Sequence, residues 1–120
     1  YSAAFANLIN IEGIIHDYRG DHEASERSFL EASLMVDRLP DEDFLKWTRV
    51  SRVDFRNRLR LNTMESYLRR GRSTTGKEKT KYAGLVRSYI SKLEREPLCN
   101  EHKSFLLVNT AVLAIMEGRL

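Results

Sequence analysis

The stretch that decides the fold reads GIIHDYRGDHEASERSFLEA and covers residues 13–32. Gly20 stands between two segments whose apolar residues recur at steps of three and four, the pattern of amphipathic helices. Glycine is favoured just past a helix end because it adopts the left-handed backbone conformation without a side-chain penalty. Residues 13–32 therefore predict two helices joined by a tight turn, which is a helical hairpin.

Glycine also follows two later helix-like segments: Gly71 follows MESYLRR and Gly118 follows VLAIME. The spacings of 51 and 47 residues between the three glycines predict a degenerate array of hairpins. Pro40 and Pro97 fall between apolar-periodic segments and indicate helix boundaries, because proline inside a helix loses a hydrogen bond and clashes with the preceding turn.

These signals predict about five helices, at residues 2–19, 22–39, 41–70, 77–95 and 100–117. The third is long enough to bend or break, and the fifth has no partner helix within the chain. No run of residues alternates as a strand does, so the predicted class is all-α. The first helix is indicated by five apolar residues at helical spacing: Phe5, Leu8, Ile11, Ile15 and Tyr18. We expect these side chains to be largely buried: Phe29, Leu34, Phe55, Leu59, Tyr67, Leu85, Tyr89 and Leu106.

The first hairpin resembles the tetratricopeptide repeat (TPR) family. The resemblance is carried by a small–turn–small–aromatic–small pattern: Gly13, Gly20 with Asp21, Ser25, Phe29 and Ala32. It implies antiparallel hairpins stacked as a short right-handed solenoid, with a concave surface that binds proteins or peptides. The spacing between glycines exceeds the family's repeat of about 34 residues, so the chain resembles a divergent relative. Generic packing of α-hairpins is the alternative.

Length and composition fit one domain. The 120 residues are 42% hydrophobic and 31% charged, which suits a folded globular protein. No apolar run approaches the roughly 18 residues that span a bilayer, and the chain does not open with a signal peptide. Cys99, the lone cysteine, favours a reducing compartment. We expect a cytoplasmic helical-repeat domain covering residues 1–120, cut from a longer protein, with no membrane partner.

Charge is distributed unevenly along the chain, although the net charge is only +3. Residues 1–43 carry a net charge of −7, residues 46–81 carry +9, and residues 82–120 carry +1. Such asymmetry bears on partners and association rather than on fold.

The basic middle supplies the candidate partner-binding residues. Five of them recur at steps of three or four and so share one helical face, and two more continue the positive field across the following loop. These seven residues, called the basic stripe, are Lys46, Arg49, Arg52, Arg56, Arg60, Arg72 and Lys77. Three interpretations stay open: a face that is solvated or paired with the acidic first hairpin, a surface for an acidic protein, or a surface for nucleic acid.

The segment GRSTTGK, residues 71–77, matches a phosphate-binding loop up to its lysine. The next residue of that motif is a serine or threonine that holds magnesium, whereas here it is Glu78. A helical rather than a strand-like segment precedes it. We therefore predict a flexible hairpin loop. Anion binding by free helix-start amides beside Arg72 and Lys77 is the weaker alternative.

No pattern points to catalysis, a cofactor or a metal. The three histidines, His16, His22 and His102, share no ligand spacing, and Cys99 with His102 lacks further partners. The sequence therefore predicts a non-catalytic protein–protein interaction module, a TPR-like scaffold within a larger regulatory protein, whose partner is a protein or peptide of acidic character. The alternative is a nucleic-acid-binding helical domain that uses the basic residues of 46–81. The oligomeric state stays open.

Overall fold

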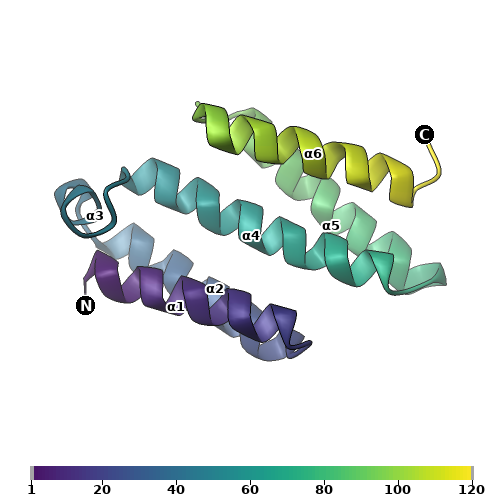
Figure 1. The fold of residues 1–120 in the computed structure, drawn as a ribbon, viewed down its shortest axis with the longest axis horizontal. Helices are drawn as coiled ribbons and strands as arrows, with labels where there is room; N and C mark the ends of the chain where they lie inside the picture. Colours follow the sequence, from purple (N-terminus) through teal and green to yellow (C-terminus); the bar gives the residue numbers. More distant parts are fainter. Residues whose placement is uncertain (1, 120) are drawn as a thin grey trace. The chain divides into compact units, whose positions relative to one another are not determined.

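The computed structural model describes residues 2–119, which form six α-helices and contain no strand (Figure 1). The predicted all-α class is confirmed. Tyr1 and Leu120 lie outside the described residues. The helices are α1 (Ala3–Tyr18), α2 (His22–Arg38), α3 (Asp41–Thr48), α4 (Arg52–Arg72), α5 (Gly76–Glu94) and α6 (Asn100–Met116).

The chain divides into two compact units, Tyr1–Leu59 and Arg60–Leu120. The boundary falls inside α4, so this helix contributes its first part to one unit and its second part to the other. Each unit has a hydrophobic core of its own.

In the first unit, α1 and α2 form an antiparallel hairpin, and Gly20 forms the turn with φ of 81° (Figure 1). The amide of Gly20 donates to the carbonyl of Asp17 at 3.0 Å, and the amide of Asp21 donates to the carbonyl of His16 at 2.9 Å. This pair of bonds is a Schellman motif. The Asp21 carboxylate then accepts from the amide of Ala24 at 3.2 Å and caps α2. The predicted hairpin is confirmed.

A close approach between Gly13 and Phe29 holds the two helices together. A Cβ atom built on Gly13 would lie 2.7 Å from Cε1 of the Phe29 ring, so the ring occupies the space that any larger residue would need. Phe29 is buried, and Ala32, one turn further along α2, is fully buried. The small–aromatic–small pattern of the sequence is therefore a packing pattern between two helices.

The apolar residues that predict α1 are not the ones that form its core face. Phe5, Leu8, Ile11, Ile15 and Tyr18 are 39–69% exposed. The buried residues of α1 are mostly small or polar: Ala3, Ala6, Ile9, Asn10, Gly13 and Asp17. Two helices can approach as closely as Gly13 and Phe29 require only if small side chains lie between them, so the bulky side chains occupy the other face.

The single helix predicted at 41–70 is two helices, so the described residues form six helices rather than about five. Arg49 ends α3 in the left-handed conformation with φ of 63°, and the Ser51 hydroxyl accepts from the amide of Asp54 at the start of α4. The break between α3 and α4 forms a corner at Arg49. The rings of Phe44 and Phe55 approach across this corner to 5.3 Å between centroids, and both side chains are fully buried. Burial of this aromatic pair offsets the interruption of the helix.

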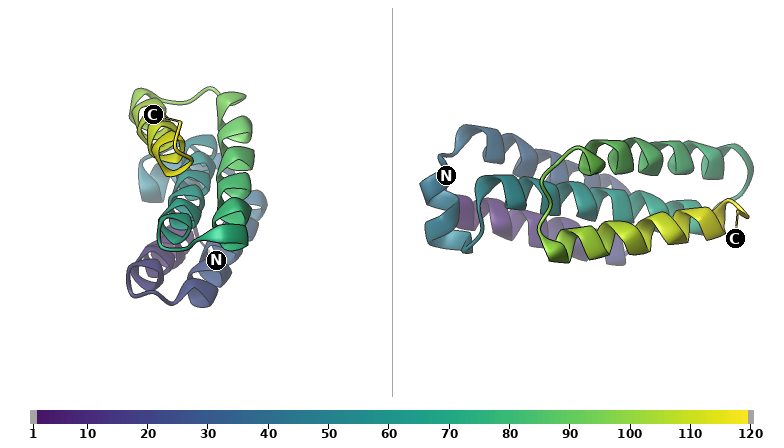
Figure 2. Two further views of the ribbon diagram at one scale, coloured as in Figure 1. Left: turned by 90° about the vertical axis from the view of Figure 1, so that its right-hand side faces the viewer. Right: turned by 90° about the horizontal axis from the view of Figure 1, so that it is seen from above.

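In the second unit, the end of α4, then α5, then α6 run alternately in opposite directions (Figure 2). All three helices contribute to one core: Leu61, Met64, Leu68, Ala83, Val86, Ile90, Leu93, Leu98, Leu106 and Leu113. The opposite side of α6 is exposed, with Leu107, Val108 and Ile115 at 62–71%.

Gly71 does not end a helix as predicted, because α4 continues through it to Arg72. A Cβ atom on Gly71 would lie 3.0 Å from Sδ of Met116 and 3.2 Å from Cβ of Tyr82. Gly71 therefore serves close packing inside the second unit. Gly118, with φ of 74°, follows α6 as predicted.

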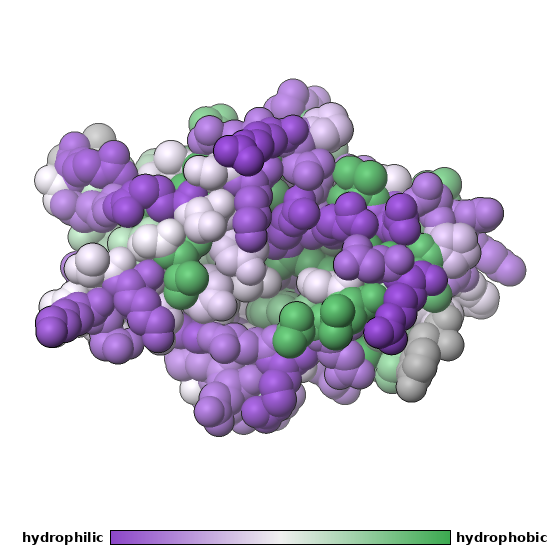
Figure 3. Space-filling model, turned by 180° about the vertical axis from the view of Figure 1, so that it is seen from behind, coloured by the Kyte–Doolittle hydropathy of each residue, from purple (hydrophilic) through white to green (hydrophobic). Residues whose placement is uncertain are grey.

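The prediction of buried side chains is confirmed for four residues, Phe29, Phe55, Leu59 and Leu106. It is wrong for Leu34, which is 49% exposed because α2 buries the face that contains Ala32, Met35 and Val36 instead. Tyr67, Leu85 and Tyr89 are partly buried. Hydrophobic atoms that reach the surface are visible in Figure 3, in patches on a face that is otherwise mostly hydrophilic.

Gly13→Ala is expected to lower the free energy of unfolding by about 1–3 kcal/mol, because the added methyl group overlaps the Phe29 ring. Urea denaturation followed by circular dichroism measures the change. Gly84→Ala is the matched control, because Gly84 lies on an exposed part of α5 with nothing within 4 Å of an added Cβ. It should be neutral or raise stability by up to about 1 kcal/mol. Equal losses in the two variants would contradict the Gly13–Phe29 contact.

Candidate interaction surfaces

Three arginines of the basic stripe, at four-residue steps along α4, each form an ion pair. In the first unit, Arg52 Nε lies 3.1 Å from a carboxylate oxygen of Asp41, and Arg56 donates to Asp37 at 3.0 Å. In the second unit, Arg60 donates to Glu96 at 3.0 Å. Because all three arginines are about one-third exposed, these contacts are surface ion pairs.

The other four residues of the basic stripe occupy different environments. Arg49 is the exposed left-handed residue that ends α3, and the ammonium of Lys46 lies 5.3 Å from the centroid of the Trp47 ring. Arg72 is the exposed last residue of α4, and Lys77 lies, exposed, in the first turn of α5. The structure thus brings carboxylates to the middle of the stripe and leaves cations exposed near helix ends.

The GRSTTGK segment joins the end of α4 to the start of α5. The residues before it are helical, so the strand–loop–helix arrangement of a phosphate-binding loop is absent from this part of the described chain. Gly76, with φ of 63°, opens α5, and the Thr75 side chain makes no capping bond at the start of this helix. The segment connects two helices, as predicted, but only residues 73–75 lie outside them, and its flexibility stays a prediction.

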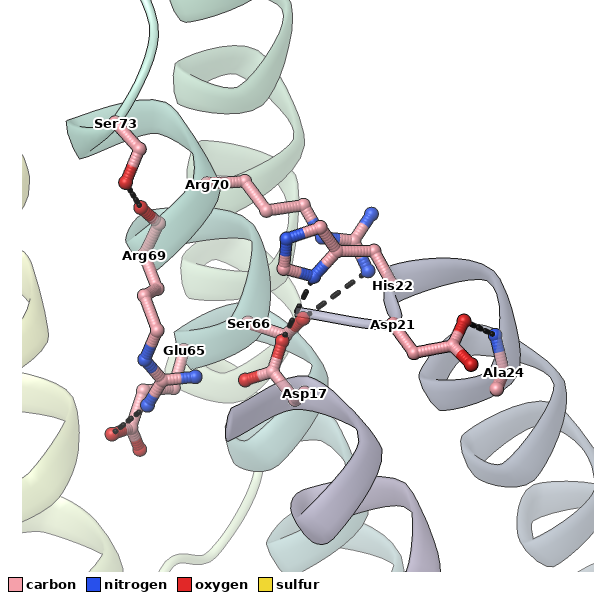
Figure 4. Close-up of polar contacts among 9 residues, drawn as sticks. All are labelled: Asp17, Asp21, His22, Ala24, Glu65, Ser66, Arg69, Arg70 and Ser73. Carbon is pink, nitrogen blue, oxygen red and sulfur yellow. Dashed lines mark hydrogen bonds and ion pairs between the residues drawn. The ribbon is translucent and has the colours of Figure 1, made fainter. Parts of the chain in front are cut away.

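His22 has a structural position beside the hairpin turn. Its Nδ1 atom lies 3.3 Å from a carboxylate oxygen of Asp17, whose side chain is only 5% exposed (Figure 4). Asp17 lies in the last turn of α1 and His22 begins α2, so the pair spans the turn at Gly20. The spacing of the two residues around Gly20 gave no sign of this contact, because they are not on one helix.

The side of α1 opposite its buried residues is an apolar surface. Four large residues recur at steps of three and four, the spacing of a coiled-coil seam, and all of them are exposed. This α1 face consists of Leu8, Ile11, Ile15 and Tyr18. The sequence does contain a signal for the α1 face, because small residues occupy one side of this helix and bulky apolar residues occupy the other.

A second apolar surface is a groove of about 420 Å³ in the second unit, between α4 and α6. One residue of α4, Glu65, and five of α6 line it, the latter being Glu101, Ser104, Phe105, Val108 and Asn109. The α6 residues recur at steps of three and four, so they share one helical face. The α4/α6 groove, as we call it, has partly exposed apolar side chains and two carboxylates, and its lining contains no basic residue.

Burial affects the ionisation of Glu65, the α4 residue in the lining of the α4/α6 groove. The Glu65 carboxylate accepts a hydrogen bond from Arg69 at 3.1 Å, four residues along α4 (Figure 4). Burial nevertheless raises the pKa of Glu65 above its usual value of 4.5. Burial, and then repulsion from Arg72, lowers the pKa of Arg69. Loss of contact with water therefore outweighs the attraction within this ion pair.

No family model, curated protein or solved structure matches the chain. No helix among the described residues combines the length and apolar character needed to cross a bilayer.

The raised pKa of Glu65 predicts a pH dependence of stability. Above pH 4.5 the unfolded chain releases this proton while the folded chain still holds it, so the free energy of unfolding falls as pH rises through the folded pKa. Glu65→Gln should remove this decline, because glutamine does not ionise. Urea denaturation at several pH values between 4 and 8 measures it, with Glu94→Gln at the exposed end of α5 as control. A decline that persists in Glu65→Gln and disappears in the control would refute the assignment.

Proposed function

We propose that this chain is a non-catalytic protein-interaction module of TPR-like hairpins, stacked as a short right-handed solenoid within a larger regulatory protein of the cytoplasm. The packing of the first hairpin supports this, because Gly13, Phe29 and Ala32 occupy the small–aromatic–small positions of its two helices. A hairpin that buries only the small side of its first helix leaves a bulky apolar side for another protein.

The observation that carries the proposal is the α1 face. Monomeric proteins rarely expose contiguous large apolar side chains, and such patches commonly mark protein-binding surfaces. In α1, Leu8, Ile11, Ile15 and Tyr18 are 43–69% exposed on one helix of 16 residues. Their seam-like spacing suits a partner helix, whose side chains interdigitate with residues at these steps.

The basic stripe has a secondary role in this proposal. Arg52, Arg56 and Arg60 already contact carboxylates, so part of their charge is compensated within the chain. Arg49, Arg72 and Lys77 remain exposed, and they supply a field that steers an acidic protein or peptide toward the module. Nucleic-acid binding needs many uncompensated cations to replace counterions, and ion pairing within the stripe reduces that supply.

Exchange of Leu8 and Ile15 for glutamine tests the α1 face. The fold should be retained within about 0.5 kcal/mol, since both side chains are exposed, while capture of protein partners from cell extract should fall more than tenfold. Circular dichroism, urea denaturation and quantitative mass spectrometry measure the two effects. Leu30→Gln, on exposed α2 surface, is the control. Unchanged capture by the double variant would remove the α1 face from the proposal.

A second experiment separates protein binding from nucleic-acid binding. Replacing Arg49, Arg52, Arg56 and Arg60 with glutamine should preserve helicity and cost at most about 1 kcal/mol per lost ion pair. Capture of acidic proteins should fall mainly at low salt, where charges are least screened. Loss of all captured proteins after nuclease treatment of the extract, with retardation of labelled RNA or DNA by the parent protein alone, would establish the nucleic-acid alternative instead.

A further inference from the structure

The α4/α6 groove differs from the α1 face in its chemistry. Phe105 and Val108 present exposed apolar side chains in a lining that also contains Glu65 and Glu101. The volume of about 420 Å³ lies within the range of about 300–1,000 Å³ typical of ligand-binding hollows. It can therefore accept several side chains of another molecule, and its rim favours positive charge.

The lining has the geometry of a site for a helix. Its α6 residues include Glu101, Phe105 and Val108, which are separated by one turn of helix at each step. Two helices, α4 and α6, run in the same direction on either side of the groove (Figures 1 and 2). A helix laid in the groove contacts the row of α6 side chains, and Glu65 of α4, through residues one turn apart on its own surface.

The charge of the lining determines which helix fits. Both ionisable residues of the groove are carboxylates, whereas the whole chain carries a net charge of +3. A carboxylate has about four acceptor positions, so Glu65 can accept a donor in addition to Arg69. Because the Glu65 side chain is only about one-third exposed, an added cation is attracted more strongly there than on an open surface.

We propose that the α4/α6 groove binds an amphipathic helix of a partner protein that carries lysine or arginine beside its apolar side chains. This inference rests on the proposed function as a protein-interaction module, and it assigns a second site with a different partner chemistry. Apolar side chains of the partner pack on Phe105 and Val108, and its cations pair with Glu65 and Glu101. An acidic helix or a nucleic acid is repelled by the same two carboxylates.

Fluorescence anisotropy with a labelled 14-residue peptide tests the site on the full chain. The peptide consists of leucine at coiled-coil seam positions, with lysine and alanine elsewhere. One matched peptide has glutamate in place of lysine, and another has alanine in place of leucine. We expect binding of the lysine–leucine peptide and at least tenfold weaker binding of both matched peptides.

Variants of the protein locate the binding. Glu65→Gln and Glu101→Gln should each weaken the lysine–leucine peptide about two- to fivefold at low salt, and less at high salt. Val108→Ser should weaken it about tenfold at both salt concentrations, because it removes an apolar contact. The controls are Leu107→Ser, on α6 but outside the lining, and Glu94→Gln at the end of α5.

Equal binding of the glutamate peptide, or equal losses in the control variants, would overturn this inference. Should Val108→Ser lower helicity, Glu101→Gln decides the result, since that side chain is exposed in the first turn of α6. The proposed function can be judged separately. If peptide binding fails while capture of protein partners still depends on Leu8 and Ile15, only the α4/α6 site is lost.

Discussion

The contact between Gly13 and the Phe29 ring is the constraint on which the first unit depends. It sets the distance between α1 and α2, because the ring fills the volume that a Cβ atom on Gly13 would need. Helices this close need mostly small side chains around the Phe29 ring, and Ala6 and Ala32 are fully buried accordingly. The bulky residues of α1 must then lie on its other side. An exposed apolar face is thus a direct consequence of close packing within the hairpin.

The second unit reaches a similar result with different residues. Leu106 and Leu113 attach α6 to α4 and α5, and the tight position of Gly71 against Met116 and Tyr82 draws the ends of the helices together. The rest of α6 is too apolar to be covered by two neighbours, so part of it remains at the surface. Both units therefore combine a packed interior with apolar helix surface, which is the property that the proposed function uses.

Electrostatics in this protein is mostly local. The sequence divides into an acidic segment and a basic segment, and Arg52 and Arg56 find carboxylates at the end of the acidic segment, on Asp41 and Asp37. Residues of the acidic and basic segments thus compensate part of each other's charge through weak ion pairs at the surface. The pair Glu65–Arg69 behaves differently, because burial makes the charged forms of both partners less favourable.

Local signals in the sequence determined the helices, the turn at Gly20 and the packing role of Phe29, since capping and periodicity depend on residues a few positions apart. They did not determine the corner at Arg49, the continuation of α4 through Gly71, or which face of α1 is buried. Each of these depends on contacts between residues distant in sequence: Phe44 with Phe55, Gly71 with Met116, and Gly13 with Phe29. The α1 face and the α4/α6 groove were missed for the same reason. Apolar periodicity shows that a helix has a bulky side, but only the packing of its neighbours decides whether that side lies in the core or at the surface.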